Sequence, residues 1–154
     1  MAEHFARVAG NSACCTGMSA TDIPGVKSHP SSYSVDETLQ RVERVVNSRG
    51  LTIFARFDHS GEAARAGLSM RPAQVLVFGN PRAGTPLMQA SPLIALELPL
   101  KVLVWQDADG RVWVSYSDPS FIANRYTIPS DLGRVLAAVE GVVETALQRT
   151  ESSG

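Results

Sequence analysis

A stripe of apolar residues near the carboxyl end constrains the fold more than any other feature of this sequence. Between residues 130 and 149 the apolar side chains recur every three or four positions, the period of an α-helix with one buried side. The stripe consists of Leu132, Val135, Leu136, Val139, Val142, Val143, Ala146 and Leu147. Because such a helix needs a second apolar surface to pack against, the sequence predicts a long C-terminal helix that covers one face of another element.

Four runs in the middle of the chain have the composition of β-strands. They cover residues 51–57, 73–78, 98–106 and 111–116. The dipeptide Asp109-Gly110 separates the last two runs, and it tolerates the positive φ angles of a tight hairpin turn. The last two strands are therefore predicted to pair antiparallel.

Helix signals lie before and between these strands. Ser34 followed by Glu37 has the form of a capping box, and an amphipathic helix is predicted from there to Gly50. Short helices are predicted over residues 62–67, 81–90 and 118–124, with a loop over 58–61 and an extended piece over 93–97. The fold class is therefore α+β, with a curved, mainly antiparallel sheet and the long C-terminal helix packed on one face. The N-terminal helix and the short helices complete it.

The amino-terminal residues differ in composition from the rest of the chain. Residues 10–32 are rich in Ser, Thr, Gly and Pro and show no apolar periodicity. We therefore expect a flexible leader over residues 1–30, a single α+β domain over 31–150 and a polar tail over 151–154.

The two cysteines predict the compartment. Cys14 and Cys15 are adjacent in the leader, so they cannot form a disulfide framework, and a translation start at Met18 would remove both. No signal peptide precedes them. These features favour a cytoplasmic protein.

Charge and hydropathy exclude two classes of partner. Fourteen basic and fifteen acidic residues leave a net charge of -1, which argues against electrostatic capture of nucleic acid or an anionic membrane. No apolar run approaches the roughly 18 residues that a membrane-spanning helix needs. We therefore expect neither nucleic acid nor membrane as a partner.

Four motifs stand in order in the middle of the chain. They are Phe57-Asp58-His59-Ser60-Gly61-Glu62-Ala63-Ala64, Leu76-Val77-Phe78-Gly79-Asn80-Pro81, Gly84-Thr85-Pro86-Leu87-Met88 and Leu98-Pro99-Leu100-Lys101-Val102-Leu103-Val104. With the Asp109-Gly110 hairpin and Tyr116-Ser117-Asp118-Pro119, they resemble the domain-of-unknown-function 302 family over residues 33–128.

This resemblance implies a fold similar to that of the TATA-box-binding protein, in which a long helix rests on a curved antiparallel sheet. It also implies a small bacterial or archaeal protein that self-associates, so a homodimer is expected. It implies no DNA binding, because function has to be argued from the site rather than from the fold. The family assigns no activity and no cofactor.

His59 and Asp58 are the candidates for catalysis. His59 follows the end of a predicted strand, and a neighbouring carboxylate can orient an imidazole for proton transfer or metal ligation. The alternative is a histidine that only hydrogen-bonds loop backbone, because neighbours on a strand point to opposite faces. A metal would need His59 and Asp58, completed by Glu97 or by the same residues of a second subunit, and no spacing is diagnostic, so no metal site is predicted.

The turn after the second strand is a candidate ligand site. Asn80 is placed to cap a helix that begins at Pro81, and backbone N–H groups at a helix N-terminus attract anions. Arg82 and Thr85 would add donors. The alternative is a turn with only a structural role. Glu97 and Lys101 are isolated charges in apolar runs, where they lie on a solvated strand face or pair in a pocket.

Three functional hypotheses follow. The first is a small-ligand-binding or sensory domain, with a pocket between the C-terminal helix and the sheet lined by His59, Asn80, Arg82, Thr85, Glu97 and Lys101. The second is an enzyme that uses His59 with Asp58 or Glu97 for acid–base chemistry. The third is a homodimeric interaction module without chemistry.

Overall fold

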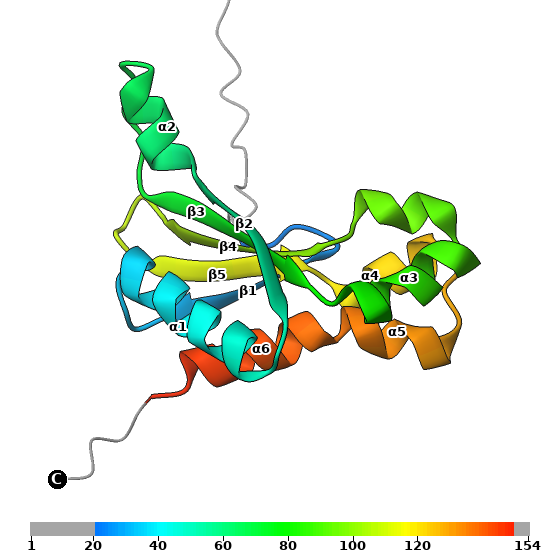
Figure 1. The fold of residues 1–154 in the computed structure, drawn as a ribbon. Coiled ribbons are helices and arrows are strands. Elements are labelled where there is room, and N and C mark those ends of the chain that lie inside the picture. Colours follow the sequence, from blue (N-terminus) through cyan, green and yellow to red (C-terminus); the bar gives the residue numbers. More distant parts are fainter. Residues whose placement is uncertain (1–20, 150–154) are drawn as a thin grey trace, which may run out of the picture.

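The structure is a computed structural model that describes residues 21–149 of the chain. These residues form a five-stranded antiparallel sheet with helices around it. Its strand order is β1-β5-β4-β3-β2 (Figure 1). The strands are β1 (Val26–Ser31), β2 (Thr52–Asp58), β3 (Ala73–Gly79), β4 (Leu100–Gln106) and β5 (Val112–Ser117). The predictions for Cys14, Cys15, Met18 and the tail 151–154 lie outside the described residues.

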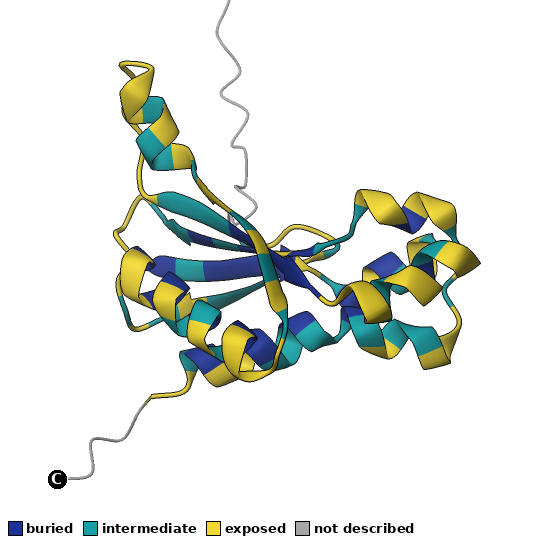
Figure 2. Ribbon diagram, viewed as in Figure 1, coloured by how far each residue is buried: buried dark blue, intermediate teal, exposed yellow. Residues whose placement is uncertain are grey.

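Two long helical segments cover one face of the sheet. They are α1 (Val35–Ser48) and α6 (Ala138–Leu147). Ala137 joins α6 to α5 (Ser130–Leu136), which packs against the short helices beyond the end of the sheet (Figure 1). The predicted long C-terminal helix is thus confirmed, with a break at one residue. Helix α1 contacts both α6 and the sheet, and the strands and both helices carry buried residues (Figure 2).

The core consists of apolar side chains that alternate along the strands and repeat along the helices. Phe78 of β3 and Val142 of α6 are fully buried. The same layer holds Leu39, Val42, Val46, Leu76, Val102, Val104, Val114 and Val139. The fold class predicted from the periodicity, α+β with helices on one face of an antiparallel sheet, is therefore confirmed.

Local capping explains where α1 begins and ends. The Ser34 hydroxyl accepts a hydrogen bond from the Glu37 amide at 3.2 Å, so the predicted N-cap is present. Two acidic residues, Asp36 and Glu37, lie in the first turn, where they favour the positive end of the helix dipole. The helix ends before Gly50, whose φ of 67° few other residues adopt.

The shorter helices lie at opposite ends of the sheet. Helix α2 (His59–Arg65) projects from the β2–β3 connection, whereas α3 (Pro81–Ala90), a 3-10 turn (Pro92–Leu96) and α4 (Pro119–Arg125) lie at the other end (Figure 1). The predicted loop over 58–61 is wrong, since Asp58 caps a helix that starts at His59. The predicted extended piece over 93–97 is also wrong, because Pro92 starts a helical turn there.

Strand β1 occupies residues that were predicted to belong to the flexible leader, which was expected to end at residue 30. It pairs antiparallel with β5, from Val26 opposite Ser117 to Ser31 opposite Val112. Its sequence, VKSHPS, is polar and includes Pro30, which an edge strand tolerates and a central strand does not. The folded part therefore begins before residue 31, and pairing with β5 supplies the order that the composition of the segment does not predict.

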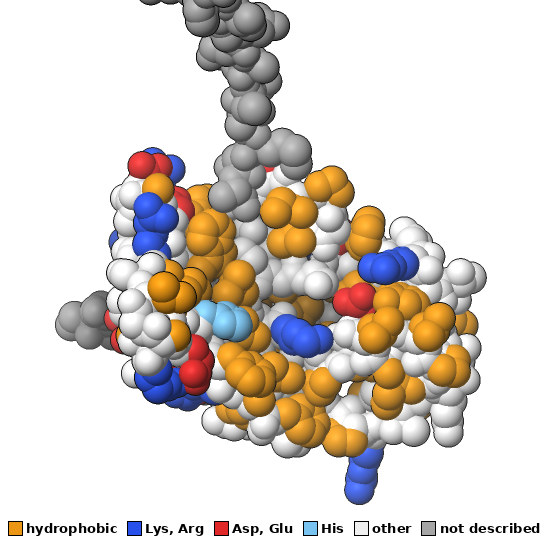
Figure 3. Space-filling view, turned by 90° about the horizontal axis from the view of Figure 1, so that it is seen from above, with side chains coloured by type: hydrophobic (Ala, Val, Ile, Leu, Met, Phe, Trp, Pro, Cys, Tyr) orange, Lys and Arg blue, Asp and Glu red, His pale blue; other side chains and the backbone are white. Residues whose placement is uncertain are grey.

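The second face of the sheet carries apolar side chains and no helix across its centre within residues 21–149 (Figure 1). The strand registers place Phe57, Val75 and Leu103 side by side on it, and likewise Trp105 and Trp113. Hydrophobic side chains gather over this face, as Figure 3 shows from above. Lys101 is the one charged side chain that the β2–β5 registers place there.

Candidate functional site

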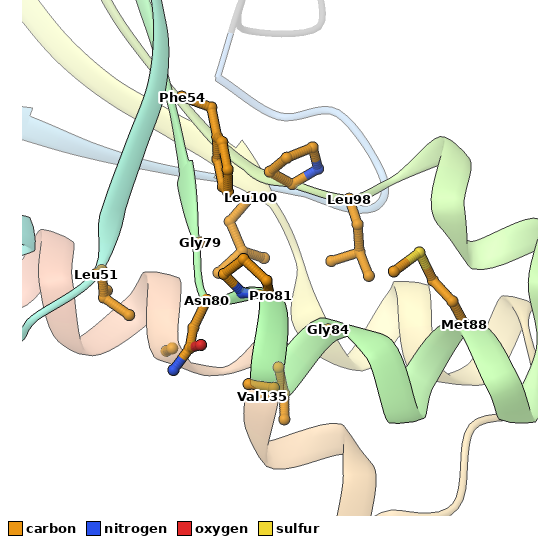
Figure 4. A pocket seen from close by; sticks show the side chains of 13 residues that line it. Leu51, Phe54, Gly79, Asn80, Pro81, Gly84, Met88, Leu98, Leu100 and Val135 are labelled. Carbon is orange, nitrogen blue, oxygen red and sulfur yellow. The ribbon is translucent and has the colours of Figure 1, made fainter.

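A cavity of about 290 Å³ lies at the end of the sheet where β3 leads into α3 (Figure 4). Strand β3 ends at Gly79, α3 begins at Pro81, and the segment before β4 and the α5–α6 helix close the remaining sides. The lining residues are Leu51, Phe54, Gly79, Asn80, Pro81, Ala83, Gly84, Met88, Leu98, Pro99, Leu100, Val135 and Ala138. The cavity touches the sheet at Gly79 and the C-terminal helices at Val135 and Ala138.

The lining of this cavity, which we call the β3–α3 pocket, is almost wholly apolar. Asn80 is its single polar side chain. Phe54 forms one wall and is 48% exposed, which is unusual for a phenylalanine on a strand. Glycine at position 79 keeps the pocket open, because a Cβ there would lie 3.6 Å from both Phe54 Cε2 and Pro99 Cβ.

The first turn of α3 satisfies its own backbone donors. The Asn80 side-chain oxygen accepts from the Arg82 amide at 3.0 Å. The Asn80 carbonyl oxygen accepts from the amides of Ala83 and Gly84 at 3.0 and 2.9 Å, and Pro81 has no N–H. No backbone N–H of this turn is left to bind an anion. The alternative interpretation, a turn with only a structural role, therefore accounts for this motif.

Arg82 and Thr85 lie on the exposed side of α3 and do not line the pocket. The Thr85 hydroxyl donates to the Pro81 carbonyl at 2.7 Å, one turn earlier in the helix. Of the six residues predicted to bind a ligand, only Asn80 lines the β3–α3 pocket.

His59 and Asp58 lie at the opposite end of the sheet, at the start of α2. The Asp58 carboxylate accepts from the Ser60 hydroxyl at 2.6 Å and from the Gly61 amide at 2.9 Å. These two bonds lower the pKa of Asp58 below its ordinary value of 3.8. The carboxylate is thus directed at its own helix, and His59 is an exposed residue with no hydrogen bond to it in the described structure.

Glu97 and Lys101 are neighbours without forming an ion pair with each other. The Lys101 ammonium donates to the backbone oxygens of Glu97 and Pro99, both at 3.2 Å. The Glu97 carboxylate accepts from the Tyr126 hydroxyl at 2.9 Å, with Arg125 Nη1 at 3.8 Å. Burial, and then this hydrogen bond, raises the pKa of Tyr126.

Glu97 and Lys101 border a second cavity of about 20 Å³, which holds one water molecule at most. The predicted site residues therefore fall into three places: His59 with Asp58, Asn80 with α3, and Glu97 with Lys101. Neither of these two cavities brings two of the three groups together.

A polar cluster between β1, β5 and α6 was missed from the sequence. Lys27 pairs with Glu140, and Asp118 lies 3.7 Å from the same ammonium. The Tyr116 hydroxyl lies 3.0 Å from His29 Nε2, and burial raises the pKa of Tyr116 to about 12. Lys27 and His29 belong to the segment predicted as leader, and only recognition of β1 would have found them.

The pocket lining was missed for another reason. Phe54, Met88 and Val135 are apolar residues in apolar patterns, and such residues are predicted to be core. No sequence signal separates a core side chain from one that borders a cavity. Among residues 21–149 no cluster of three or more His, Cys, Asp or Glu is placed to hold a metal ion, and no helix is long and apolar enough to cross a membrane.

Comparison with solved structures gives the same fold. The crystal structure of an uncharacterized conserved DUF302 protein from Bacillus stearothermophilus superposes with a TM-score of 0.67. The alignment covers 81% of this chain and 97% of that chain, at 20% sequence identity. At this identity the likeness establishes the fold alone.

Comparison with curated proteins finds closer sequence matches. The fluoride-specific ion channel FluC 1 of Brucella suis biovar 1 (strain 1330) is 40% identical over 104 residues, which are 68% of this chain and 41% of that protein. FluC 1 of Brucella abortus biovar 1 (strain 9-941) is also 40% identical over 104 residues, 38% of its length. The chain thus spans about two fifths of the length of these relatives.

The family comparison agrees with the four sequence motifs and with the fold. The match covers residues 27–146, from the second residue of β1 into α6, and so includes the β3–α3 pocket. The chain belongs to the family described as Domain of unknown function DUF302.

Proposed function

We propose that this domain binds a small molecule in the β3–α3 pocket. The observation that supports the proposal is the cavity of about 290 Å³, which lies between sheet and helices and is lined by apolar side chains with one polar group. Small-molecule sites have this character: concave, mostly apolar and furnished with few polar groups. Binding here would change the contacts between β3, α3 and the C-terminal helix, which gives a sensory domain its means of response.

Acid–base catalysis has less support than binding. The enzyme hypothesis needs His59 to act with Asp58 or Glu97. The Asp58 carboxylate is held by Ser60 and Gly61, and Glu97 by Tyr126. Neither carboxylate has a hydrogen bond to His59 in residues 21–149, and none of the three residues lines the β3–α3 pocket.

The names of the curated relatives suggest where such a domain works. Those proteins are described as fluoride-specific ion channels, and the chain corresponds to about two fifths of their length. We propose that the domain senses a small molecule on behalf of a partner activity, as a domain attached to a channel would. Fluoride itself is a poor fit to the pocket, because a strongly hydrated anion needs several donors and the lining offers one side-chain amide.

The test fills the pocket. In Gly84→Leu the new side chain starts from a Cβ position 3.7 Å from Leu98 Cδ1 and extends into the cavity. The probe is N-phenyl-1-naphthylamine, an uncharged dye whose fluorescence rises in apolar surroundings. We expect saturable binding of one dye per chain, weakened at least tenfold in Gly84→Leu.

Two controls make this result specific. Gly133→Leu introduces the same side chain into α5 at a glycine with open space around it, outside the pocket lining. His59→Ala removes the side chain of the earlier candidate at the far end of the sheet. Both variants should bind the dye as the unaltered protein does. Equal dye binding by Gly84→Leu and Gly133→Leu would show that the dye does not bind in the pocket. Loss of dye binding in His59→Ala would place the binding site near α2 instead.

The open face of the sheet favours a second function, self-association. We propose that two copies pack through this face, which carries the row Phe57, Val75 and Leu103. Antiparallel sheets that face water ordinarily carry polar side chains there, and sheets with two apolar faces pack against another layer. Because Lys101 is the one charge that the β2–β5 registers place on this face, apposition of two copies buries little charge.

Sedimentation equilibrium tests this proposal. Phe57, 53% exposed, is replaced by Glu, and the control is Leu96→Glu, at a residue that is 74% exposed but lies outside the sheet. We expect a dimer for the unaltered protein and for Leu96→Glu, and a folded monomer for Phe57→Glu. A monomer at every concentration for the unaltered protein would overturn the proposal.

A further inference from the structure

We propose that the ligand of the β3–α3 pocket is an uncharged, mainly apolar molecule, about as large as a two-ring aromatic compound, with one hydrogen-bond acceptor that meets Asn80. This inference rests on the proposed function and specifies the chemical class of the ligand. It follows from three properties of the pocket: the charge of its lining, the hydrogen bonding of the Asn80 side chain and the dimensions of the cavity.

The lining excludes a charged ligand group. No Asp, Glu, Lys, Arg or His is among the residues that line the pocket. The backbone donors of the first α3 turn are already bonded to Asn80, so a buried anion would find no compensating amides. Since burial of an unpaired charge is far more costly than burial of apolar surface, the ligand has to be neutral where it enters the pocket.

Asn80 fixes which polar group the ligand carries. Its side-chain oxygen accepts from the Arg82 amide as the cap of α3, so the side-chain nitrogen is the end that remains to donate. Within the described structure no group accepts from this nitrogen, and Asn80 is an exposed residue that borders the pocket. An amide nitrogen donates and does not accept, so its partner on the ligand is an acceptor such as a carbonyl or ether oxygen.

The volume sets the size of the ligand. An apolar protein cavity of about 150 Å³ accommodates benzene. The β3–α3 pocket, at about 290 Å³, has roughly twice that space, which suits two fused rings or a branched chain of similar bulk.

The walls favour a flat ligand. An added Cβ at Gly79 would lie 3.6 Å from both Phe54 Cε2 and Pro99 Cβ, so these two side chains border the space beside Gly79. A ring inserted there stacks against the half-exposed Phe54, and removal of that surface from water contributes to binding.

A matched series of three naphthalenes tests the inference by displacement of N-phenyl-1-naphthylamine. In this series 2-acetylnaphthalene is neutral with an acceptor, 2-ethylnaphthalene keeps the two rings and the two-carbon side chain but lacks the carbonyl oxygen, and 2-naphthoate is charged at pH 7. We expect the ketone to bind most tightly. The ethyl compound should bind roughly 3–10-fold more weakly, as expected for one lost hydrogen bond. The carboxylate should bind at least 100-fold more weakly.

Asn80→Asp separates the donor from the cap. Aspartate caps helices as well as asparagine does, so the fold is retained while the amide donor is lost. In this variant the ketone and the ethyl compound should bind equally. Circular dichroism and thermal unfolding verify that the variant is folded.

The outcomes distinguish this inference from the proposed function. Equal affinities of the three compounds for the unaltered protein, tightest binding of the carboxylate, or an unchanged ketone preference in Asn80→Asp would each overturn the ligand class. Failure of all three to displace the dye would overturn it as well. The proposed function stands or falls separately, on whether Gly84→Leu loses the dye while Gly133→Leu keeps it.

Discussion

At the scale of single residues, Asn80 has two roles. Its side-chain oxygen caps α3, and the same side chain is the one polar group of the pocket. Under the proposed function, a residue that both starts a helix and borders the binding cavity couples ligand binding to the stability of that helix. The sequence predicted the cap correctly, because Asn before Pro is a strong helix-start signal, but it did not predict the apolar surroundings.

The capping role gives the first prediction. Asn80→Ala should lower the free energy of unfolding by about 1 kcal/mol, because the Arg82 amide loses its acceptor. Asn80→Asp should lower the free energy of unfolding much less, because the aspartate carboxylate also accepts from the Arg82 amide. Urea denaturation monitored by circular dichroism measures both. An alanine variant as stable as the unaltered protein would show that this hydrogen bond contributes nothing.

Asp58 gives the second prediction, which concerns pH. The bonds from Ser60 and Gly61 lower the pKa of Asp58 in the folded protein, so folding favours the charged carboxylate. Its stabilising contribution is therefore complete well above pH 3.8, the ordinary pKa, and is lost as the pH falls through the lower pKa of the folded state.

Comparison with Asp58→Asn isolates this effect, because asparagine keeps the cap and does not titrate. Thermal unfolding of the two proteins is measured from about pH 6 down to about pH 2, the range in which a lowered carboxyl pKa acts. The advantage of the unaltered protein should shrink toward the acid end. A difference that stays constant with pH would contradict the lowered pKa.

At the scale of elements, the strands and helices with strong local signals were predicted. The 3.6-residue stripe gave the α5–α6 helix, the Ser34 cap gave the start of α1, and Gly110 takes up positive φ in the β4–β5 hairpin. Elements that depend on partners were not predicted. Strand β1 is polar and is ordered by β5, and the start of α2 depends on the Asp58 side chain.

Strand β1 gives the third prediction. Removal of residues 1–32 deletes the strand and exposes the edge of β5, including the side of Tyr116 that faces His29. An exposed edge strand with buried apolar neighbours promotes aggregation. The truncated chain should unfold at a lower temperature than a chain that starts at Met18, or should elute as aggregates in size-exclusion chromatography. Equal melting temperatures and a single compact peak would show that β1 is dispensable.

At the scale of the whole molecule, the two faces of the sheet differ in what covers them. One face packs against α1 and α6, and the other exposes Phe57, 53% accessible. The alternation along each strand predicts one buried face, but it does not predict whether the opposite face meets water or another molecule. The pocket is likewise a property of the assembled molecule, because its lining comes from segments far apart in the chain.

The asymmetry of the faces gives the fourth prediction. Phe78 is fully buried beneath the helices, so Phe78→Ala should lower the free energy of unfolding by about 3–5 kcal/mol. Phe57→Ala should change the stability of the monomer by less than about 0.5 kcal/mol, because its ring is half exposed. Urea unfolding at low protein concentration measures both. Similar losses from the two substitutions would mean that the outer face is also covered within one chain.

The β3–α3 pocket is the proposed binding site of this DUF302 domain. The most direct test is a ¹H–¹⁵N NMR titration of the full chain with 2-acetylnaphthalene. Shifts should concentrate on the amides of Gly79, Asn80, Gly84 and Ala138 and saturate together, and they should be absent in Gly84→Leu. Shifts centred instead on the His59 end of the sheet or on its open face, with the pocket amides unmoved, would contradict the account.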